Sequence, residues 1–255
     1  MNGRSDEIYS TKRPELSCVI PAFNEEACIQ KVLLELITAL NERNIDYEII
    51  VIDNGSSDGT TYLIEEVKRS FPKVKMIRFV KNCGYGGAIL SGLSSSTGEI
   101  IGFTSADGET PPECLIQMYE LIKSGHIDLC KAKRINRQDG FYRKTLSLGY
   151  HLLVELLFNL HIADINGYPI LITHSAYKRL RLTKTDWMIN FEILFQSRRA
   201  GFRIAEVDVK HRKRFGGASH IRWHTSLIMF CQILRIRWKI YRKHPGSLYN
   251  EAVVS

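Results

Sequence analysis

The stretch that decides the fold is residues 98–113, Gly-Glu-Ile-Ile-Gly-Phe-Thr-Ser-Ala-Asp-Gly-Glu-Thr-Pro-Pro-Glu. Its apolar run at 100–103 is typical of a strand buried in a parallel sheet. The prolines at 111–112 are suited to the first turn of a helix. Asp107 and Glu109 therefore lie between a strand and a helix, at the carboxyl end of the strand, where open α/β sheets bind their ligands.

The two carboxylates of this turn allow two interpretations. Hard divalent cations prefer oxygen ligands and bind together with substrate phosphates, so Asp107 and Glu109 could hold a metal and, through it, a diphosphate. The same pair could equally be a solvated acidic turn. The residues of this stretch alone leave both interpretations open.

Outward from this stretch, short apolar runs alternate with amphipathic segments. Such alternation predicts βαβ units and a mostly parallel sheet. The predicted strands are 16–20, 48–52, 75–79, 100–103, 128–132, 169–172 and 204–209. The helical periodicity is clearest at 29–40, 113–123, 145–160, 187–200 and 223–241.

The loops that follow the first four strands carry polar and glycine-rich motifs, at 23–25, 53–54, 84–87 and 105–109. Right-handed crossovers place all of these loops at one edge of a parallel sheet. We therefore expect the four loops to converge on a cleft large enough for a nucleotide.

The charge of the chain is unevenly distributed. At 255 residues, 44% of them hydrophobic, the chain can form one large α/β domain or two small ones. Residues 193–255 contain 13 Lys or Arg and three Asp or Glu, a net charge of +10 in a chain whose total is +8. A basic quarter beside a nearly neutral body indicates an anionic partner, such as phosphate, nucleic acid or a lipid surface.

Cysteine usage and hydropathy bear on the compartment. The six cysteines form no C-x-x-C pair and several lie in apolar segments, which favours free thiols in a reducing compartment. The first residues lack the apolar core of a secretory signal, and no stretch approaches the roughly 18 apolar residues of a spanning helix. We expect a cytoplasmic protein, peripheral on the cytoplasmic face of a membrane if it binds lipid.

Five motifs occur in order at the predicted junctions between strands and helices. They are Pro-Ala-Phe-Asn-Glu at 21–25, Ile-Asp-Asn-Gly-Ser-Ser-Asp-Gly-Thr at 52–60, Asn-Cys-Gly-Tyr-Gly at 82–86, Ala-Asp-Gly-Glu-Thr-Pro-Pro-Glu at 106–113 and Arg-Phe-Gly-Gly-Ala-Ser at 214–219. Together they resemble glycosyltransferase family 2, and most of all its dolichyl- or polyprenyl-phosphate sugar synthases. The likeness covers about residues 15–222.

The resemblance implies an α/β GT-A fold with a mostly parallel sheet, a nucleotide-sugar donor and a divalent metal, Mg²⁺ or Mn²⁺. The residues that would line the nucleoside pocket or contact the base and ribose are Pro21, Phe23, Glu25, Ile52 and Asn54. Those that would hold the diphosphate and the metal are Ala106, Asp107 and Glu109. By the same resemblance, Arg134 would face the phosphates of donor or acceptor, and Arg214 and His220 would close over the site.

The chain departs from the family pattern at four positions. Ser105 stands where the metal turn commonly begins with Asp, and Glu109 stands where the synthases often have Gln. The Asp-Asp pair of the base pocket ends here in Asn54, which leaves the identity of the base open. His220 replaces the usual Lys of the last loop, so that one phosphate contact would depend on pH.

Several other residues keep a structural alternative. The glycines of 84–87 favour a tight turn with positive φ, with pocket lining as a by-product. Asp164 is a turn residue or positions an acceptor group, a Lys or an Arg. Glu192 is a helix carboxylate paired with an arginine at 198–199, or a general base if the acceptor is a hydroxyl. Asp58 is a candidate N-cap of the second helix.

The predicted organisation is a flexible N-terminus at 1–14, a GT-A domain at 15–222 and a basic amphipathic helix and tail at 223–255. The aromatic and basic residues of the last segment favour either packing on the domain or contact with an anionic membrane. Basic aromatic tails also bind nucleic acid, but a metal turn and a cleft have no use there, so no nucleic-acid partner is expected.

The sequence therefore predicts an inverting glycosyltransferase with Asp107, Arg134 and Arg214 as its candidate catalytic residues. It would transfer a sugar from GDP-mannose or a UDP-sugar to polyprenyl or dolichyl phosphate, an acceptor already ionised and in no need of a general base. One alternative is transfer to a glycan hydroxyl with Glu192 or Asp164 as base. Another, suggested by Ser105, is a catalytically impaired protein that binds nucleotide-sugars.

Overall fold

The computed structural model describes residues 13–135, 141–217 and 223–243 of the chain. Its strands are β1 (Leu16–Ala22), β2 (Tyr47–Asp53), β3 (Val74–Arg78), β4 (Ile100–Phe103), β5 (Leu129–Ile135), β6 (Ile170–Thr173) and β7 (Ile204–Lys210). Its helices are α1 (Ile29–Glu42), α2 (Thr60–Ser70), α3 (Tyr85–Ser95), α4 (Pro112–Lys123), α5 (Phe141–Phe158), α6 (His174–Tyr177), α7 (Ile189–Arg199) and α8 (Trp223–Lys243).

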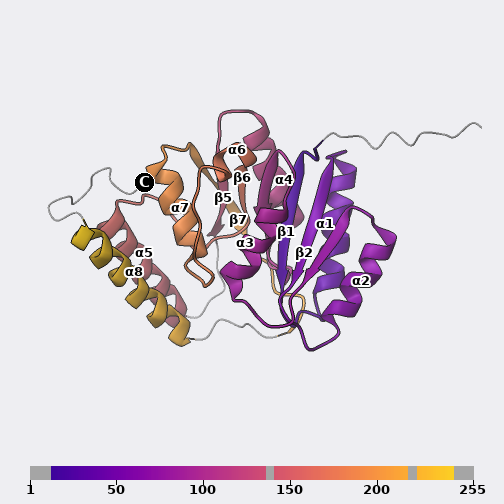
Figure 1. The fold of residues 1–255 in the computed structure, drawn as a ribbon, viewed down its shortest axis with the longest axis horizontal. Helices are drawn as coiled ribbons and strands as arrows, with labels where there is room; N and C mark the ends of the chain where they lie inside the picture. The colour runs from indigo at the N-terminus through magenta and orange to yellow at the C-terminus, as the bar shows by residue number, and fades with distance from the viewer. Residues whose placement is uncertain (1–12, 136–140, 218–222, 244–255) are drawn as a thin grey trace, which may run out of the picture.

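The seven strands form one sheet in the order β3-β2-β1-β4-β6-β5-β7. Strands β1 to β4 are parallel, and β5 is parallel to β7. Strand β6 runs antiparallel to both of its neighbours, β4 and β5. The predicted fold class, α/β with a mostly parallel sheet flanked by helices, is confirmed (Figure 1).

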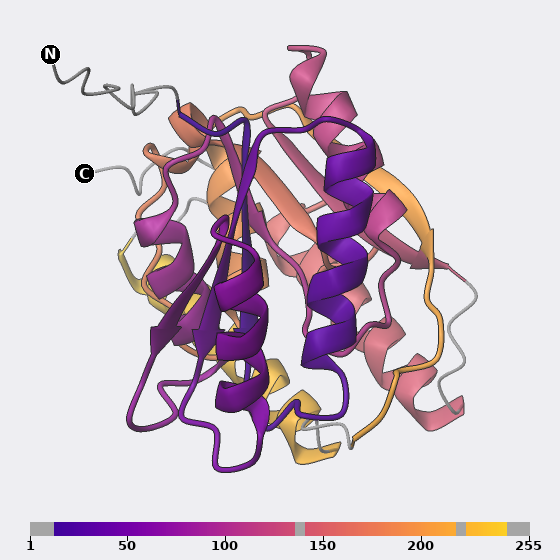
Figure 2. The same ribbon diagram turned by 90° about the vertical axis from the view of Figure 1, so that its right-hand side faces the viewer.

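The sheet separates two apolar cores because alternate residues of a strand point to opposite faces. On one face, apolar side chains of β1 and β2 pack against α1, α2 and α4, the helices of the first half that Figure 2 shows in front of the sheet. On the other face, Val19, Ile50 and Ile52 pack with residues of α3, α5, α7 and α8. A strand buried on both faces reads as a continuous apolar run, which is why β2 could be recognised.

Strand β1 is two residues longer than predicted. Pro21 was expected to end it, but Pro21 pairs with Ile52 and Ala22 with Asp53. The pairing of β1 with β4 already ends at Val19, so the N–H that proline lacks is not needed on that side. The extension brings loop 23–25 beside the end of β2.

Helix α2 begins one residue later than the predicted cap implies. Its N-cap is Gly59 rather than Asp58. The Asp58 carboxylate instead accepts the Thr60 N–H at 3.0 Å, while the Glu26 carboxylate accepts the Gly59 N–H at 2.7 Å. Two acidic side chains thus accept the first backbone N–H groups of α2, which a single N-cap side chain would otherwise do. Glu26 thereby connects the end of loop 23–25 to the start of α2.

Helices α5 and α8 lie side by side at one end of the molecule, beyond α7 (Figure 1). Tyr150 of α5 meets Phe230 of α8 edge to face, with ring centroids 6.0 Å apart. Large apolar side chains remain exposed on both helices, namely Leu148, Leu152, Leu156, Ile228, Leu234 and Trp238. Within the described ranges, none of the helices has the length and apolar character needed to cross a membrane.

Candidate functional site

The turn after β4 holds the carboxylate of Asp107 in a fixed position. Its Oδ1 atom accepts the Ser105 hydroxyl at 2.6 Å and the Glu109 N–H at 3.0 Å. Gly108 between them has φ +74°, a conformation that favours glycine. Ser105, which departs from the family pattern, therefore supports Asp107 through a hydrogen bond instead of adding a second charge.

Glu109 faces the same region as Asp107. The Tyr168 hydroxyl lies 3.3 Å from Asp107 Oδ2 and 3.4 Å from Glu109 Oε2. His211 Nδ1 lies 3.4 Å from the same Glu109 oxygen. The hydrogen bond from His211 is the largest of the influences that lower the pKa of the Glu109 carboxyl below its ordinary value, so Glu109 is an anion at neutral pH.

The segment 211–217 crosses this turn, and we call it the strap. The Arg212 N–H donates to the Glu109 carbonyl at 2.9 Å, and the Phe215 N–H donates to the Asp107 carbonyl at 3.2 Å. The Phe215 ring packs so closely on Gly108 that a Cβ there would lie 2.5 Å from it. The ammonium group of Lys31 lies over the Phe215 ring in a cation–π contact, with Nζ 3.9 Å from the ring centroid.

Arg214 of the strap lies between two predicted donor-site residues. Its guanidinium forms an ion pair with Glu25 and lies 3.9 Å from Asp107 Oδ2. Burial opposes the charge of Arg214, but the ion pair with Glu25 outweighs it and raises the pKa of the guanidinium above its ordinary value. Glu25, Asp107 and Arg214, chosen from three separate motifs, are thus brought together.

Asn54 ties the end of β2 to loop 82–84. Its amide nitrogen donates to Asn82 Oδ1 and to the Gly84 carbonyl, both at 3.2 Å. Its carbonyl oxygen accepts the Cys83 N–H at 2.9 Å. The Asn54 backbone N–H donates to the Ala22 carbonyl at 2.8 Å, so the ends of β1, β2 and β3 meet as predicted.

The other predicted nucleoside and diphosphate residues lie at or just after the carboxyl ends of β1, β2 and β4. Ile52 and Ala106 are buried in the cores, whereas Pro21 and Phe23 are partly exposed. Contact of any of them with a nucleotide stays a prediction. His220 lies outside the described residues.

The glycine loop 82–87 has a structural explanation. Gly84 has φ +85°, and a Cβ there would collide with the Thr185 carbonyl. A Cβ on Gly86 would lie 2.5 Å from the Lys184 carbonyl. Because the backbone of 184–186 lies against the start of α3, both positions need glycine for close approach. Among the glycines of 84–87, the expected positive φ occurs only at Gly84.

Arg134 is fixed by Asp164, as the interpretation of Asp164 as a positioning residue predicted. Its Nε and Nη2 atoms donate to the two Asp164 oxygens at 2.6 and 2.8 Å, a bidentate pair. Burial opposes the charge on Asp164, but Arg134 outweighs it and lowers the pKa of that carboxyl well below its ordinary value. The buried ammonium of Lys131 donates to the Asp164 carbonyl and lies 3.5 Å from Glu206.

Glu192 has partners other than the arginines at 198–199. Its carboxylate accepts the Thr183 N–H and hydroxyl and the Lys184 N–H, each at 2.8 Å. Glu192 therefore holds the loop that packs on α3. This structural role explains the residue without a catalytic function.

Sequence reasoning missed Tyr168 and His211. Tyr168 follows the Asp164 turn and precedes β6, while His211 follows β7. Neither belongs to a motif with a characteristic spacing. They could have been found only from the order of strands, which places β6 next to β4.

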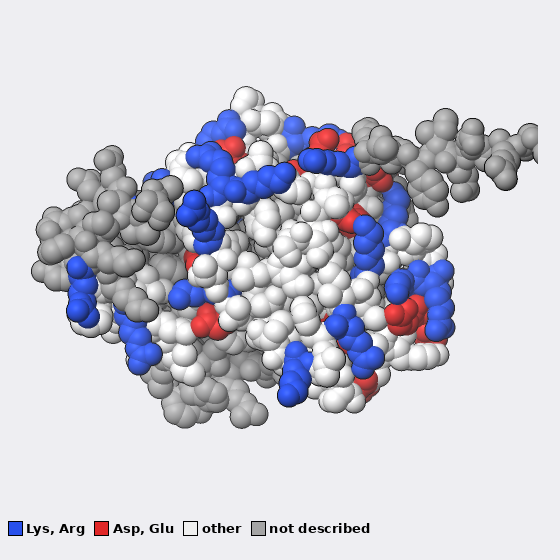
Figure 3. All heavy atoms as spheres, in the orientation of Figure 1, with Lys and Arg blue, Asp and Glu red and all other residues white. Residues whose placement is uncertain are grey.

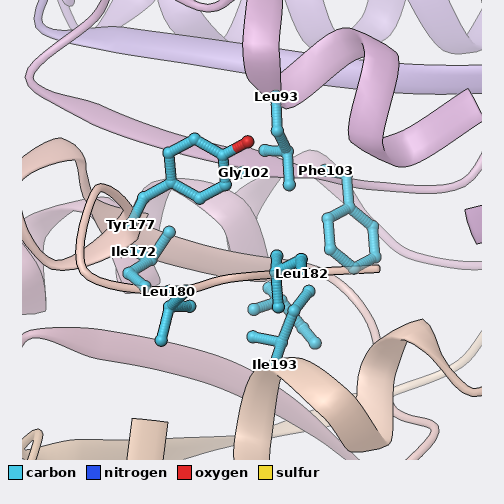
Figure 4. Close-up of a pocket in the computed structure, with 9 residues that line it drawn as sticks. Leu93, Gly102, Phe103, Ile172, Tyr177, Leu180, Leu182 and Ile193 are labelled. Atoms are coloured by element: carbon cyan, nitrogen blue, oxygen red, sulfur yellow. The ribbon is translucent and has the colours of Figure 1, made fainter. Parts of the chain in front are cut away.

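None of the residues of this cluster lines the cavity drawn in Figure 4. It is lined by apolar side chains such as Leu93, Phe103 and Ile193, and it encloses only about 10 Å³. That is about the minimum for one water molecule, and the lining offers a water few polar partners. The cavity is a packing defect between α3, β4 and α7.

Asp107 and Glu109 could supply two of the ligands of a divalent cation but not a full coordination shell. In the described part of the chain, no three or more His, Cys, Asp or Glu side chains are grouped to hold a metal ion. Asp107 and Glu109 nevertheless direct one oxygen each at a single hydroxyl. Two carboxylates with open positions suit Mg²⁺ or Mn²⁺, which take further oxygens from substrate phosphates and water.

Solved structures resemble the chain in fold. Glucosyl-3-phosphoglycerate synthase from Mycobacterium tuberculosis, in complex with Mn²⁺, UDP and glucosyl-3-phosphoglycerate, has a TM-score of 0.69 at 19% identity. The match covers 94% of this chain and 82% of that one. The same synthase with phosphoglyceric acid gives a TM-score of 0.69 at 21% identity over 87% of this chain and 79% of that one. The chain therefore has the GT-A fold.

Curated relatives carry names of lipid-phosphate sugar transferases. Undecaprenyl-phosphate 4-deoxy-4-formamido-L-arabinose transferase of Aeromonas hydrophila subsp. hydrophila is 33% identical over 58% of this chain, and the match spans 46% of that protein, less than half its length. Dolichyl-phosphate beta-glucosyltransferase of Dictyostelium discoideum is 28% identical over 92% of this chain and 75% of that protein. A dolichyl-phosphate beta-glucosyltransferase of Trichomonas vaginalis is 26% identical over 90% and 75%.

The family model of glycosyl transferase family 2 matches residues 17–185, well over half of the chain. This range contains all of β1 except Leu16, the strands β2 to β6 and the turn with Asp107 and Glu109. The predicted resemblance is confirmed: four of the five motifs lie in the matched range, and the fifth, at 214–219, lies beyond it. The chain belongs to glycosyl transferase family 2 and is a glycosyltransferase.

Proposed function

We propose that this protein is an inverting glycosyltransferase that moves a sugar from a nucleotide-sugar to the phosphate of a polyprenyl or dolichyl lipid, with Mg²⁺ or Mn²⁺. The observation that carries the proposal is the convergence of Asp107, Glu109 and Arg214 at the end of β4. Two anions beside a cation suit a metal-bound diphosphate. The names of the relatives support a lipid phosphate as acceptor.

For the donor we propose a UDP-sugar, and UDP-glucose first. The support is the UDP held by a protein of the same fold and the glucosyltransferase names of two relatives. Glu25 and Asn54 would border the nucleoside. Asp107 and Glu109 would hold the cation, which when bound would offset the negative charge that develops on the leaving diphosphate.

The acceptor phosphate would be steered by Arg134 and Arg214. A guanidinium pairs bidentately with phosphate oxygens. An oxygen of the acceptor phosphate attacks the anomeric carbon from the face opposite the diphosphate, and the bond from that carbon to the diphosphate oxygen breaks. A single displacement inverts the anomeric configuration. Because the acceptor is already ionised, no side chain has to remove a proton.

The strap would have to move for a donor to bind. Arg214 now pairs with Glu25 and approaches Asp107, and Phe215 lies against Gly108. These contacts are made with the same turn that would receive the diphosphate. We propose that a bound diphosphate replaces Glu25 and Asp107 as the partner of Arg214.

The function is tested by a transfer assay on the purified full chain. We expect radiolabel from UDP-glucose to appear in lipid when polyprenyl phosphate and Mn²⁺ or Mg²⁺ are present, and to stay in water with EDTA. GDP-mannose serves as the competing donor. Transfer to free glycans but not to polyprenyl phosphate would contradict the lipid-phosphate acceptor, whereas tight donor binding with no transfer to either would indicate a nucleotide-sugar-binding protein.

We further propose peripheral contact with an anionic membrane through α8, the helix at the start of the basic segment 223–255. Figure 3 shows basic side chains standing out from this helix. Arg242 lies over the Trp238 ring, 4.7 Å from its centroid, and the Trp238 side chain is 57% exposed. Exposed apolar groups flanked by Arg favour the interface, where each basic residue contributes about 1 kcal/mol.

Replacing Trp238 by Glu is expected to reduce flotation with phosphatidylcholine–phosphatidylserine vesicles by at least about tenfold, because burial of a large apolar side chain contributes roughly 1.5–3 kcal/mol. Tyr62→Glu is the matched control, since Tyr62 is an aromatic residue of α2 that is 62% exposed. The control should float like the wild type. Equal flotation of all three proteins would rule out contact through α8.

A further inference from the structure

Tyr168 is the residue at which the two candidate metal carboxylates meet. Its hydroxyl oxygen lies 3.3 Å from Asp107 Oδ2 and 3.4 Å from Glu109 Oε2. A phenol has one proton to donate, so it can serve either carboxylate, but only one at a time. Two carboxylates close together repel each other, and a neutral donor placed between them offsets that repulsion.

The remaining partners of the two carboxylates are distributed around this point. Asp107 Oδ1 is occupied by Ser105 and by the Glu109 N–H. His211 approaches Glu109 Oε2 at 3.4 Å. Arg214 Nη1 lies 3.9 Å from Asp107 Oδ2. The two oxygens that approach the Tyr168 hydroxyl are thus also the ones that face His211 and Arg214, and they are directed at a common position. Tyr168 is the group that defines where they converge.

Tyr168 is held firmly enough to define that position. It directly follows the turn 164–167, in which the Gly167 N–H donates to the Asp164 carbonyl at 2.9 Å. A Cβ on Gly167 would collide with the Ala132 carbonyl of β5, so the turn lies directly on the sheet. The bidentate pair of Asp164 with Arg134 fixes its other end.

The phenol of a tyrosine is protonated at neutral pH, so the Tyr168 hydroxyl is a hydrogen-bond donor to these carboxylates. Its ring lies beside that of His211, with centroids 5.6 Å apart. Tyr168 consequently joins β6, the metal turn and the strap at one side chain.

We propose that Tyr168 is a positioning residue for the divalent cation: its hydroxyl, which can donate to Asp107 Oδ2 or to Glu109 Oε2, keeps both oxygens directed toward one position at which a single cation could bind. This inference rests on the proposed function, which assigns the cation to this carboxylate pair. It adds a residue outside the five motifs. It also explains how a turn that begins with Ser105 can still present a preformed site.

The test is a titration of the full chain with Mn²⁺ alone. The electron paramagnetic resonance signal of the free ion monitors the titration and gives the dissociation constant for Mn²⁺. Tyr168→Phe keeps the ring and removes the hydroxyl, and we expect it to bind Mn²⁺ about tenfold more weakly, the usual effect of losing a group that orients metal ligands. Its thermal unfolding should stay close to that of the wild type, because the ring packing is retained.

Tyr150→Phe is the matched control. Tyr150 is also a buried phenol, but its hydroxyl lies 3.8 Å from Met188 Sδ, in the second core. This variant should bind Mn²⁺ like the wild type. If Tyr168→Phe also binds Mn²⁺ within twofold of the wild type, while Asp107→Asn loses binding, the role of Tyr168 is wrong and the proposed function stands.

Two further outcomes separate the inference from the function. If Asp107→Asn binds Mn²⁺ as tightly as the wild type, the proposed metal site itself is wrong, and the inference falls with it. If Tyr168→Phe does not fold, 3-fluorotyrosine incorporated at position 168 replaces it. Its fluorine resonance should broaden strongly when Mn²⁺ binds, and a resonance that stays sharp at saturating Mn²⁺ would overturn the inference.

Discussion

Replacing Asp107 by Asn is expected to reduce sugar transfer by about 10³-fold or more in the presence of Mg²⁺ or Mn²⁺. The change keeps the shape of the side chain and its hydrogen bond with Ser105, but it removes the negative charge that would attract the cation. Neutralising the charge on a leaving diphosphate is worth several kcal/mol, and about 4 kcal/mol corresponds to a factor of 10³ in rate. The measurement is initial rate at saturating donor, acceptor and metal.

Asp208→Asn provides the control for this variant. Asp208 lies on β7, is mostly exposed, and its Oδ1 atom lies 3.4 Å from Lys133 Nζ. Its charge has no role in the proposed binding of the cation, so the rate of sugar transfer should be unchanged. Loss of an exposed ion pair also has little effect on stability. Full activity of Asp107→Asn would show that the carboxylate does not hold an essential cation.

Replacing Arg134 by Ala is expected to have the largest effect on stability, a loss of about 3–5 kcal/mol in the free energy of unfolding. The reason is that Asp164 would keep its negative charge while losing both donors of the bidentate pair. Denaturation by urea, followed by circular dichroism, measures the effect. Transfer should fall as well, since the acceptor phosphate would lose one guanidinium.

The pH dependence of the free energy of unfolding tests whether the Arg134–Asp164 ion pair stabilises the fold. The folded pKa of Asp164 is depressed, so the unfolded chain takes up the proton first as pH falls. The stabilisation is therefore fully present above about pH 4, the range in which an unfolded Asp is ionised, and it is lost as pH falls further. Asp164→Asn should show a shallower decline below pH 4, and an equally steep decline would contradict the ion pair.

The parts of the site that the sequence could predict are those carried by βα loops. Glu25, Asn54 and Asp107 each follow a strand with a clear apolar pattern, and parallel strands bring their ends together whatever the details of packing. Arg214 could be added because a glycine loop with a basic residue suits phosphate. The fold class followed from the same alternation of strands and helices.

The parts that the sequence could not predict depend on the order of strands in the second half. Strand β6 inserts antiparallel between β4 and β5, and this insertion brings Tyr168 onto the carboxylates. Only four residues long, β6 carries no signal of its direction. The neighbourhood of Glu192 was likewise set by tertiary packing, because its partners Thr183 and Lys184 lie in a loop without a motif.

The glycines of 84–87 illustrate the limit of motif reasoning in a different way. Their pattern resembles a family motif, and a nucleotide-binding role would have been a natural inference. The close approach of Thr185 and Lys184 shows a packing reason for Gly84 and Gly86. A glycine motif can therefore be explained by the close approach of two segments of the same chain, whether or not a ligand binds there.

The most direct test of the account is a crystal structure of the full chain grown with Mn²⁺ and UDP, with anomalous diffraction measured at the manganese absorption edge. The account predicts one strong anomalous peak at bonding distance, about 2.1 Å, from carboxylate oxygens of Asp107 and Glu109, with the diphosphate of UDP on its other side. UDP bound at the strand ends without a peak at these carboxylates, or a peak elsewhere on the chain, would contradict it.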